Sequence, residues 1–248
     1  MTVESAQDLQ GLKEIGKIIA LTVRHMQARL RPGMTTAELD AIGAAFLQRH
    51  GAQPAPKLTY NFPGVTCISL NDEAAHGVPG NRRIRPGDLV NIDVSAELDG
   101  YFADTGETMI VPPVAPARKR LVDCARAARD QAIAAAQAGQ PLNAIGKAAE
   151  RQAQRCGFNI ICELAGHGIG RRLHEEPRDV PGFFTRLASR RLHEGLVITI
   201  EPFLSTGSGR VVTDANGWTI RTVDGGLSAQ FEHTIVVTRG QPIVLTAI

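Results

Sequence analysis

The sequence has few cysteines, few aromatic residues and almost no excess charge, and these shortages exclude several classes of protein. Its four cysteines, Cys67, Cys124, Cys156 and Cys162, show no Cys-x-x-Cys spacing and no dense disulfide framework. That usage is typical of a reducing compartment and predicts a cytoplasmic protein. With a net charge of only +2 and 4% aromatic residues, the chain has no broad basic field, so nucleic acid is not an expected partner.

Long apolar runs are also missing, and none reaches the roughly 18 residues that would span a membrane. The polar, acidic start Met-Thr-Val-Glu-Ser differs from a secretory signal peptide. The basic stretch 118–120, with Arg126 and Arg129, is interpreted as a solvated helix face. The chain is nevertheless 43% hydrophobic over 248 residues, so it can build a sizeable core as one large domain or two small ones.

Hydrophobic spacing predicts an alternation of helices and strands. Helical periodicity covers about 9–30, and a capping box from Thr35 to Glu38 opens a second helix that ends near Gly51. Alanine-rich helices are expected at about 116–138 and 143–156. Strands are expected near 65–70, 88–97, 101–111, 158–163, 196–204, 210–213, 217–223 and 230–238.

Several motifs recur in the same order in the two halves of the chain. His76-Gly-Val-Pro79 is echoed by His174-Glu-Glu-Pro177, and the segment 87–93 is echoed by 195–201, with offsets of 98 and 108 residues. We therefore predict a single α+β catalytic domain, 1–248, built from an internal repeat of approximately 5–112 and 115–248. Coincidence among short helical and strand patterns is the alternative.

A two-residue turn at Asp99-Gly100 predicts a β-hairpin whose register can be worked out. Leu98 would pair with Tyr101, which places Ser95 opposite Asp104. Because side chains alternate along a strand, Asp93 shares its face with Ser95. Asp93 and Asp104 should then be diagonal neighbours, roughly 7–8 Å apart at their Cα atoms, within reach of shared ions. An ordinary acidic surface hairpin is the competing interpretation.

Carboxylates stand beside other apolar runs as well, and together with one histidine they form a candidate metal-ligand set. The set is Asp93, Asp104, His167, Glu201 and Glu232. Two divalent cations would offset four negative charges, and oxygen ligands with one imidazole suit Mn, Fe, Co or Zn. Paired metals can activate water for amide hydrolysis, without a serine or cysteine nucleophile. The glycines around His167 do not form a dinucleotide-binding motif.

These residues and their surroundings resemble type I methionine aminopeptidases. The resemblance rests on His76-Gly-Val-Pro79, Gly166 to Pro177, Thr199-Ile-Glu-Pro202 and Ser228 to Thr234. It implies the pita-bread fold, in which pseudo-twofold duplicated helix-helix-sheet units enclose a curved, antiparallel-rich sheet. Only 27 positions separate His174 from Glu201, which leaves no room for the helical insertion of the type II enzymes.

The resemblance also implies metal-binding roles. Asp104 and Glu232 would bridge two divalent ions, Asp93 would bind one of them, and His167 with Glu201 would bind the other. The identity of the ions, among Co, Mn, Fe and Zn, stays open.

Three side chains would act on the substrate by the same resemblance. Glu201 would relay a proton from the attacking water. His76 would hydrogen-bond the amide beyond the scissile bond, and His174 would polarise the scissile carbonyl. For both histidines, a structural loop role is the alternative.

Candidates for the methionine pocket are Tyr60, Phe62, Cys67 and Trp218, each of which could instead pack in the core. Two departures from the family pattern predict a reshaped pocket. Tyr60-Asn-Phe-Pro63 is one residue shorter than usual, and Leu173 replaces an aromatic residue.

The predicted function is metal-dependent removal of the initiator methionine from nascent polypeptides whose second residue is small. The ribosome is a candidate partner, no membrane partner is expected, and the protein is predicted to be a monomer. An X-Pro aminopeptidase-like hydrolase and a non-catalytic pita-bread binding protein are the alternatives.

Overall fold

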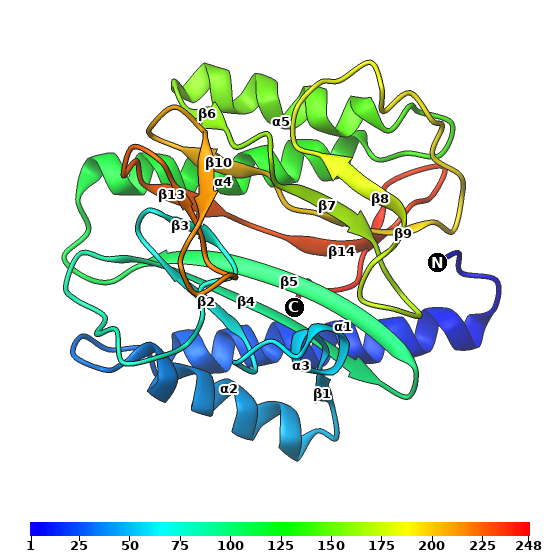
Figure 1. Cartoon of the computed structure of the whole chain (residues 1–248). Helices are drawn as coiled ribbons and strands as arrows, with labels where there is room; N and C mark the ends of the chain where they lie inside the picture. The colour runs from blue at the N-terminus through cyan, green and yellow to red at the C-terminus, as the bar shows by residue number, and fades with distance from the viewer.

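Two pairs of helices enclose the strands in a computed structural model that describes residues 1–248 (Figure 1). Helices α1 (Ala6–Gln27) and α2 (Thr36–Arg49) lie on one side of the strands, and α4 (Pro116–Ala135) and α5 (Asn143–Cys156) lie on the other. None of these helices combines the length and apolar character that a membrane crossing requires.

Local chemistry fixes where the helices begin and end. Ser5 caps α1 and Thr35 caps α2, each through a reciprocal capping box, and the second of these was predicted. Gly157 ends α5 in the left-handed conformation, with φ of 77°. A short helix that the sequence did not predict, α3 (Ala55–Tyr60), ends at Asn61, which is also left-handed.

The strands form four sheets, in which every pairing between named strands is antiparallel. One sheet comprises β1 (Gln53–Pro54), β2 (Cys67–Leu70), β4 (Leu89–Leu98) and β5 (Tyr101–Ile110). The largest comprises β7 (Ala165–Gly168), β8 (Glu175–Pro181), β9 (Val197–Ile200), β14 (His233–Val236) and β15 (Ile243–Val244). One small sheet comprises β6 (Asn159–Ile160), β10 (Phe203–Ser205) and β13 (Ser228–Gln230). The other comprises β3 (Glu73–Ala75), β11 (Val211–Thr213) and β12 (Ile220–Thr222).

The two halves of the chain meet where β5 runs beside the segment that connects β13 to β14. The backbone N–H of Glu232 donates to the carbonyl of Gly106 at 2.9 Å, and the Thr105 hydroxyl donates to the Glu232 carbonyl at 2.8 Å. Farther along, the Thr234 hydroxyl accepts from the Asp104 N–H at 2.9 Å. These bonds bring Asp104 and Glu232, which are far apart in the sequence, to the same junction.

Separate apolar clusters support the two sides of this junction. The first packs α1 and α2 against β4 and β5, with Leu12, Ile19 and Ile92 fully buried. The second packs α4 and α5 against β9 and β14, with Leu121 and Ile235 fully buried. Burying a side chain of this size stabilises the fold by about 1.5–3 kcal/mol. The first cluster also includes Val197 of β9 and Val236 of β14, so it ties the two halves together.

Two predicted strands are interrupted. The expected run 196–204 breaks at Glu201 and Pro202 into β9 and β10, which belong to different sheets. The run 230–238 breaks at Phe231 and Glu232 between β13 and β14. The continuous-strand prediction is wrong at both places, because each segment leaves one sheet to pair in another.

Two expectations about α4 also need correction. Arg129 is 8% exposed rather than solvated, because its guanidinium lies 5.5 Å from the centre of the Phe231 ring. Cys124 and Cys156 form a disulfide between α4 and α5, which their spacing of 32 residues did not indicate. The packing of the two helices brings their Cα atoms to 6.4 Å, within the range that a disulfide spans.

Candidate metal centre and active site

The β4–β5 hairpin carries two aspartates on one face. Leu98 pairs with Tyr101 and Ser95 pairs with Asp104, as the turn at residues 99–100 predicted. Asp93, two residues before Ser95, therefore projects to the same side as Asp104. The register worked out from the sequence is confirmed.

The second half contributes three more candidate ligands. His167 lies on β7, Glu201 directly follows β9, and Glu232 lies between β13 and β14. The Thr199 hydroxyl joins two of them: it accepts from the His167 N–H at 3.0 Å and donates to Glu201 Oε1 at 2.9 Å. Gln230 Nε2 donates to Glu232 Oε2 at 3.0 Å. These two supporting residues were not predicted, although both lie inside the motifs that the sequence analysis singled out.

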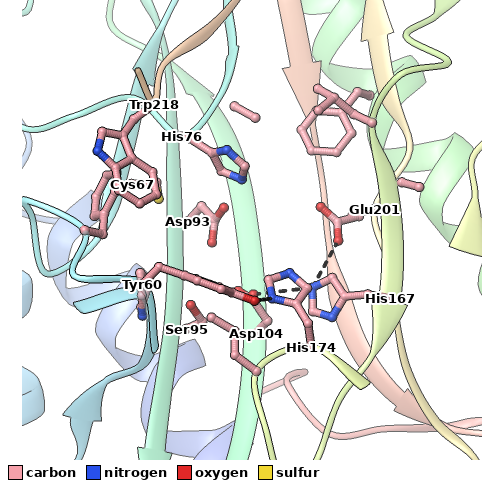
Figure 2. A pocket seen from close by; sticks show the side chains of 17 residues that line it. Tyr60, Cys67, His76, Asp93, Ser95, Asp104, His167, His174, Glu201 and Trp218 are labelled. Atoms are coloured by element: carbon pink, nitrogen blue, oxygen red, sulfur yellow. Dashed lines mark hydrogen bonds and ion pairs between the residues drawn. The ribbon is translucent and has the colours of Figure 1, made fainter. Parts of the chain in front are cut away.

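Four of the candidate ligands, Asp93, Asp104, His167 and Glu201, face one another across the junction (Figure 2). His167 Nε2 lies 3.7 Å from Glu201 Oε1 and 3.9 Å from Asp104 Oδ2. Ligand atoms of Asp104, His167 and Glu232 all lie within 4.8 Å of one another. Asp93 and Glu201 border the same cavity. The structure thus gathers all five predicted ligands around one site.

Hydrogen bonding leaves one ring nitrogen and two carboxylate oxygens of this site free to bind a cation. The carbonyl of Gly168 lies 3.0 Å from His167 Nδ1, which donates to it and keeps the Nε2 lone pair directed at the carboxylates. Asp104 Oδ1 and Glu232 Oε1 are buried and have no hydrogen-bond partner. Because buried polar atoms are nearly always paired, these orphaned oxygens fit a site for cations.

Burial shifts the pKa of every candidate ligand, and repulsion between carboxylates adds to the shift at three of them. Desolvation raises the pKa of Asp93 to about 6. The pKa values of Asp104, Glu201 and Glu232 are raised well above the usual range, first by burial and then by the neighbouring carboxylates. Burial lowers the pKa of His167 to about 3, so its ring is neutral at physiological pH. Divalent cations would remove the cost of ionising these carboxylates together.

A cavity of about 370 Å³ opens beside the carboxylates. All four predicted pocket residues line it, and so do Leu164, Leu173 and Phe203, of which Leu164 and Phe203 were not predicted. Phe62 and Trp218 meet edge to face with ring centres 5.3 Å apart, which makes one wall apolar and rigid. A long apolar side chain fits such a cavity.

Two further histidines that the sequence analysis singled out, His76 and His174, border the cavity. His76 has a φ of 52°, and its carbonyl accepts from the Thr219 hydroxyl at 3.3 Å. The ring centre of His174 lies 4.0 Å from that of His167. Desolvation lowers the pKa of both His76 and His174, which favours neutral rings able to donate one N–H each.

Sequence and structure comparisons agree with this geometry. Residues 10–239 match the metallopeptidase family M24. The chain belongs to this family. Methionine aminopeptidase 2 of Bacillus subtilis (strain 168) is 45% identical over 99% of both chains. A methionine aminopeptidase of Staphylococcus epidermidis (strain ATCC 12228 / FDA PCI 1200) is 44% identical over 100% of this chain and 99% of the relative.

Solved structures of the M24 family share the fold. The crystal structure of methionine aminopeptidase from Rickettsia prowazekii superposes with a TM-score of 0.95 at 34% identity, over 100% of both chains. The prolidase from Pyrococcus furiosus has a TM-score of 0.81 at 22% identity, with 66% of that chain covered, and shares the fold alone. The predicted pita-bread architecture and the resemblance to methionine aminopeptidases are confirmed. Membership of a metallopeptidase family, with the Asp104, His167 and Glu232 cluster, supports the use of divalent metal.

Proposed function

We propose that this protein is an aminopeptidase that removes the initiator methionine from nascent polypeptides whose second residue is small. The observation that carries the proposal is the pair of orphaned oxygens on Asp104 and Glu232, beside the free Nε2 of His167 at the edge of an apolar cavity. Full-length similarity to proteins named methionine aminopeptidases supports the same activity.

The donor set fits two divalent cations from among Co, Mn, Fe and Zn. Asp93, Asp104, His167, Glu201 and Glu232 would hold these ions. When bound, such ions lower the pKa of water and stabilise negative charge on oxygen.

The side chains around this centre have distinct tasks in peptide hydrolysis. Glu201, held by the Thr199 hydroxyl, accepts a proton from the attacking water and passes it to the leaving amine. His174 donates an N–H to the scissile carbonyl oxygen and stabilises the charge that develops there. His76 hydrogen-bonds the amide on the far side of the scissile bond.

The apolar cavity selects the residue that is removed. Phe62, Cys67 and Trp218 border the space beside Asp93, and Leu173 closes it with a side chain that is 3% exposed. An unbranched, polarisable methionine side chain adapts to a wall of this mixed shape. Tyr60 lies at the mouth, 46% exposed, where the peptide enters.

We further propose that residues 1–248 act as one catalytic domain with related halves, 5–112 and 115–248. Its equivalent parts are the helix pair α1 and α2 with β4, and the helix pair α4 and α5 with β9. Because the substrates are nascent chains, we place the enzyme in the cytoplasm, as a monomer acting near the ribosome.

A peptide-cleavage panel on metal-stripped protein, with each cation restored in turn, tests the activity. Met-Ala-Ser should be cleaved only after a divalent cation is added, and Ala-Pro peptides should be poor substrates. Preferential cleavage of Ala-Pro would instead identify an X-Pro aminopeptidase. Tight peptide binding without turnover under any cation would identify a binding protein.

A further inference from the structure

A hydrogen bond across the mouth of the cavity joins the two halves of the site. Tyr60, the last residue of α3, places its hydroxyl 2.7 Å from Nδ1 of His174. Figure 2 shows the Tyr60 side chain reaching over the cavity to the His174 ring. The ring centres lie 5.5 Å apart and are tilted by 49°, so the contact is made by the hydroxyl rather than by stacking.

The chemistry of the two groups gives this bond a direction. A phenol is a good hydrogen-bond donor, and the unprotonated nitrogen of a neutral imidazole is a good acceptor. If Tyr60 donates to Nδ1, the single ring proton of His174 must be on Nε2.

The neighbouring histidine has the opposite arrangement. His167 donates from Nδ1 to the Gly168 carbonyl, so its Nε2 has a lone pair that faces Asp104 and Glu201. Two imidazoles with centres 4.0 Å apart are therefore held in different tautomers by different partners. One presents a lone pair suited to a cation, and the other presents an N–H suited to an oxygen that gains negative charge.

We propose that Tyr60 is a positioning residue for hydrolysis, whose hydroxyl holds His174 in the Nε2–H tautomer and in the orientation that donates to the scissile carbonyl. The proposal rests on the role of His174 in the proposed function. It gives the Tyr60 hydroxyl a task separate from that of the Tyr60 ring, which only borders the cavity.

The variant Tyr60→Phe isolates this task, because it keeps the ring and removes one oxygen. With zinc- or cobalt-loaded enzyme and Met-Ala-Ser, kcat should fall about tenfold, the equivalent of one lost hydrogen bond. KM should stay within about twofold, because the cavity wall is unchanged. A wild-type kcat, or a loss confined to KM, would overturn the proposal.

Tyr101→Phe is the matched control. Tyr101 is the only other tyrosine in the chain, and its hydroxyl bonds Arg171 at 2.9 Å, three residues before His174. The variant therefore tests whether the loss of any tyrosine hydroxyl hydrogen bond near residues 171–174 lowers kcat. Tyr101→Phe should leave kcat unchanged; an equal loss in both variants would mean that general loosening of the segment, and not the His174 tautomer, explains the effect.

A double-variant cycle shows whether Tyr60 acts through His174. Tyr60→Phe should add nothing to the loss caused by His174→Ala, because the ring that it positions is already gone. Additive losses would contradict the proposal. Normal turnover by His174→Ala alone would instead refute the assigned role of His174, so the two failures are distinguishable.

Nitrogen-15 NMR of the zinc-loaded protein measures the tautomer of His174 independently of any activity assay. In the wild type, His174 should show an unprotonated Nδ1 and a protonated Nε2. In Tyr60→Phe, both nitrogens should move toward exchange-averaged values, whereas His167 should not change. A protonated Nδ1 on His174 in the wild type would refute the proposal even if the enzyme is active.

Discussion

Thr199 and Glu201 lie on the same side of the chain at the end of β9, and the Thr199 hydroxyl donates to Glu201 Oε1 at 2.9 Å. The same hydroxyl accepts from the backbone N–H of His167, 32 residues earlier in the sequence. Thr199 is fully buried, so water cannot replace either bond. One side chain thus orients a proposed proton relay and fixes the strand that carries a proposed metal ligand.

Replacing Thr199 by valine should remove both hydrogen bonds while keeping the volume of the side chain. Valine matches the shape but leaves Glu201 Oε1 and the His167 N–H without a partner, which costs about 1–3 kcal/mol for each buried group. We expect kcat to fall about tenfold or more, with a lower free energy of unfolding in urea. Thr199→Ser keeps the hydroxyl and should retain most of the activity; equal losses in the two variants would argue that packing alone matters.

The variant Glu201→Gln tests the proton relay directly. An amide keeps the size of the side chain but cannot accept and return a proton at neutral pH. We expect kcat for Met-Ala-Ser to fall by at least about 100-fold, the scale of general acid–base catalysis. Circular dichroism should show an unchanged fold. Near-normal turnover would exclude Glu201 as the relay.

Truncating His174 to alanine should act on the transition state more than on binding. The ring is exposed at the mouth of the cavity, so its loss leaves no large buried void. Because the N–H bonds most strongly to the developing oxyanion, we expect kcat to fall about 100-fold with a small change in KM. An effect on KM alone would point to a role in substrate binding only.

Metal affinity should weaken in acid. Protons compete with cations for Asp93, whose pKa is about 6, and for Asp104, Glu201 and Glu232, whose pKa values are higher than usual. His167, with a pKa of about 3, stays neutral and does not compete. Between pH 8 and pH 5.5, titration calorimetry should show about a fourfold loss of affinity from competition at Asp93 alone, and a further loss from the other three carboxyls.

The raised pKa values of the carboxyls also predict how the stabilisation by metal depends on pH. A carboxyl whose pKa is raised on folding contributes stability that is present below its unfolded pKa of about 4. For Asp93 this contribution is lost as the pH rises through about 6. Metal should therefore raise Tm more at pH 8 than at pH 5.5, as thermal scans with and without chelator can measure. A Tm gain that does not depend on pH would contradict binding at these carboxylates.

Much of the local structure could be predicted from the sequence. The turn at Asp99-Gly100 fixed the register of β4 with β5, because a two-residue turn leaves one pairing and side chains alternate strictly. The capping box at Thr35 and Glu38 marked the start of α2, because its partners are three residues apart. Such features depend on neighbours in the chain.

Contacts between distant segments could not be predicted in the same way. Continuous strands were expected through Glu201 and Glu232, yet the chain changes sheets at both places. Pro202 is a local signal of the first break, because proline cannot donate to a sheet, but nothing local marks the second. The burial of Arg129 against Phe231 and the disulfide of Cys124 with Cys156 depend on how α4 packs. In each case the partner is set by tertiary packing.

By itself the sequence determined which residues could bind metal, the face that Asp93 and Asp104 share, and the family that the motifs resemble. Those features follow from side-chain chemistry and from bond geometry over a few residues. The tertiary structure alone decided that five ligands from two halves meet, that Thr199 joins two of them, and that Tyr60 bonds His174. Those relationships arise from apolar clusters that bring together segments far apart in the chain, 32 residues for His167 and Thr199 and 114 for Tyr60 and His174, where local propensity specifies neither distance nor direction.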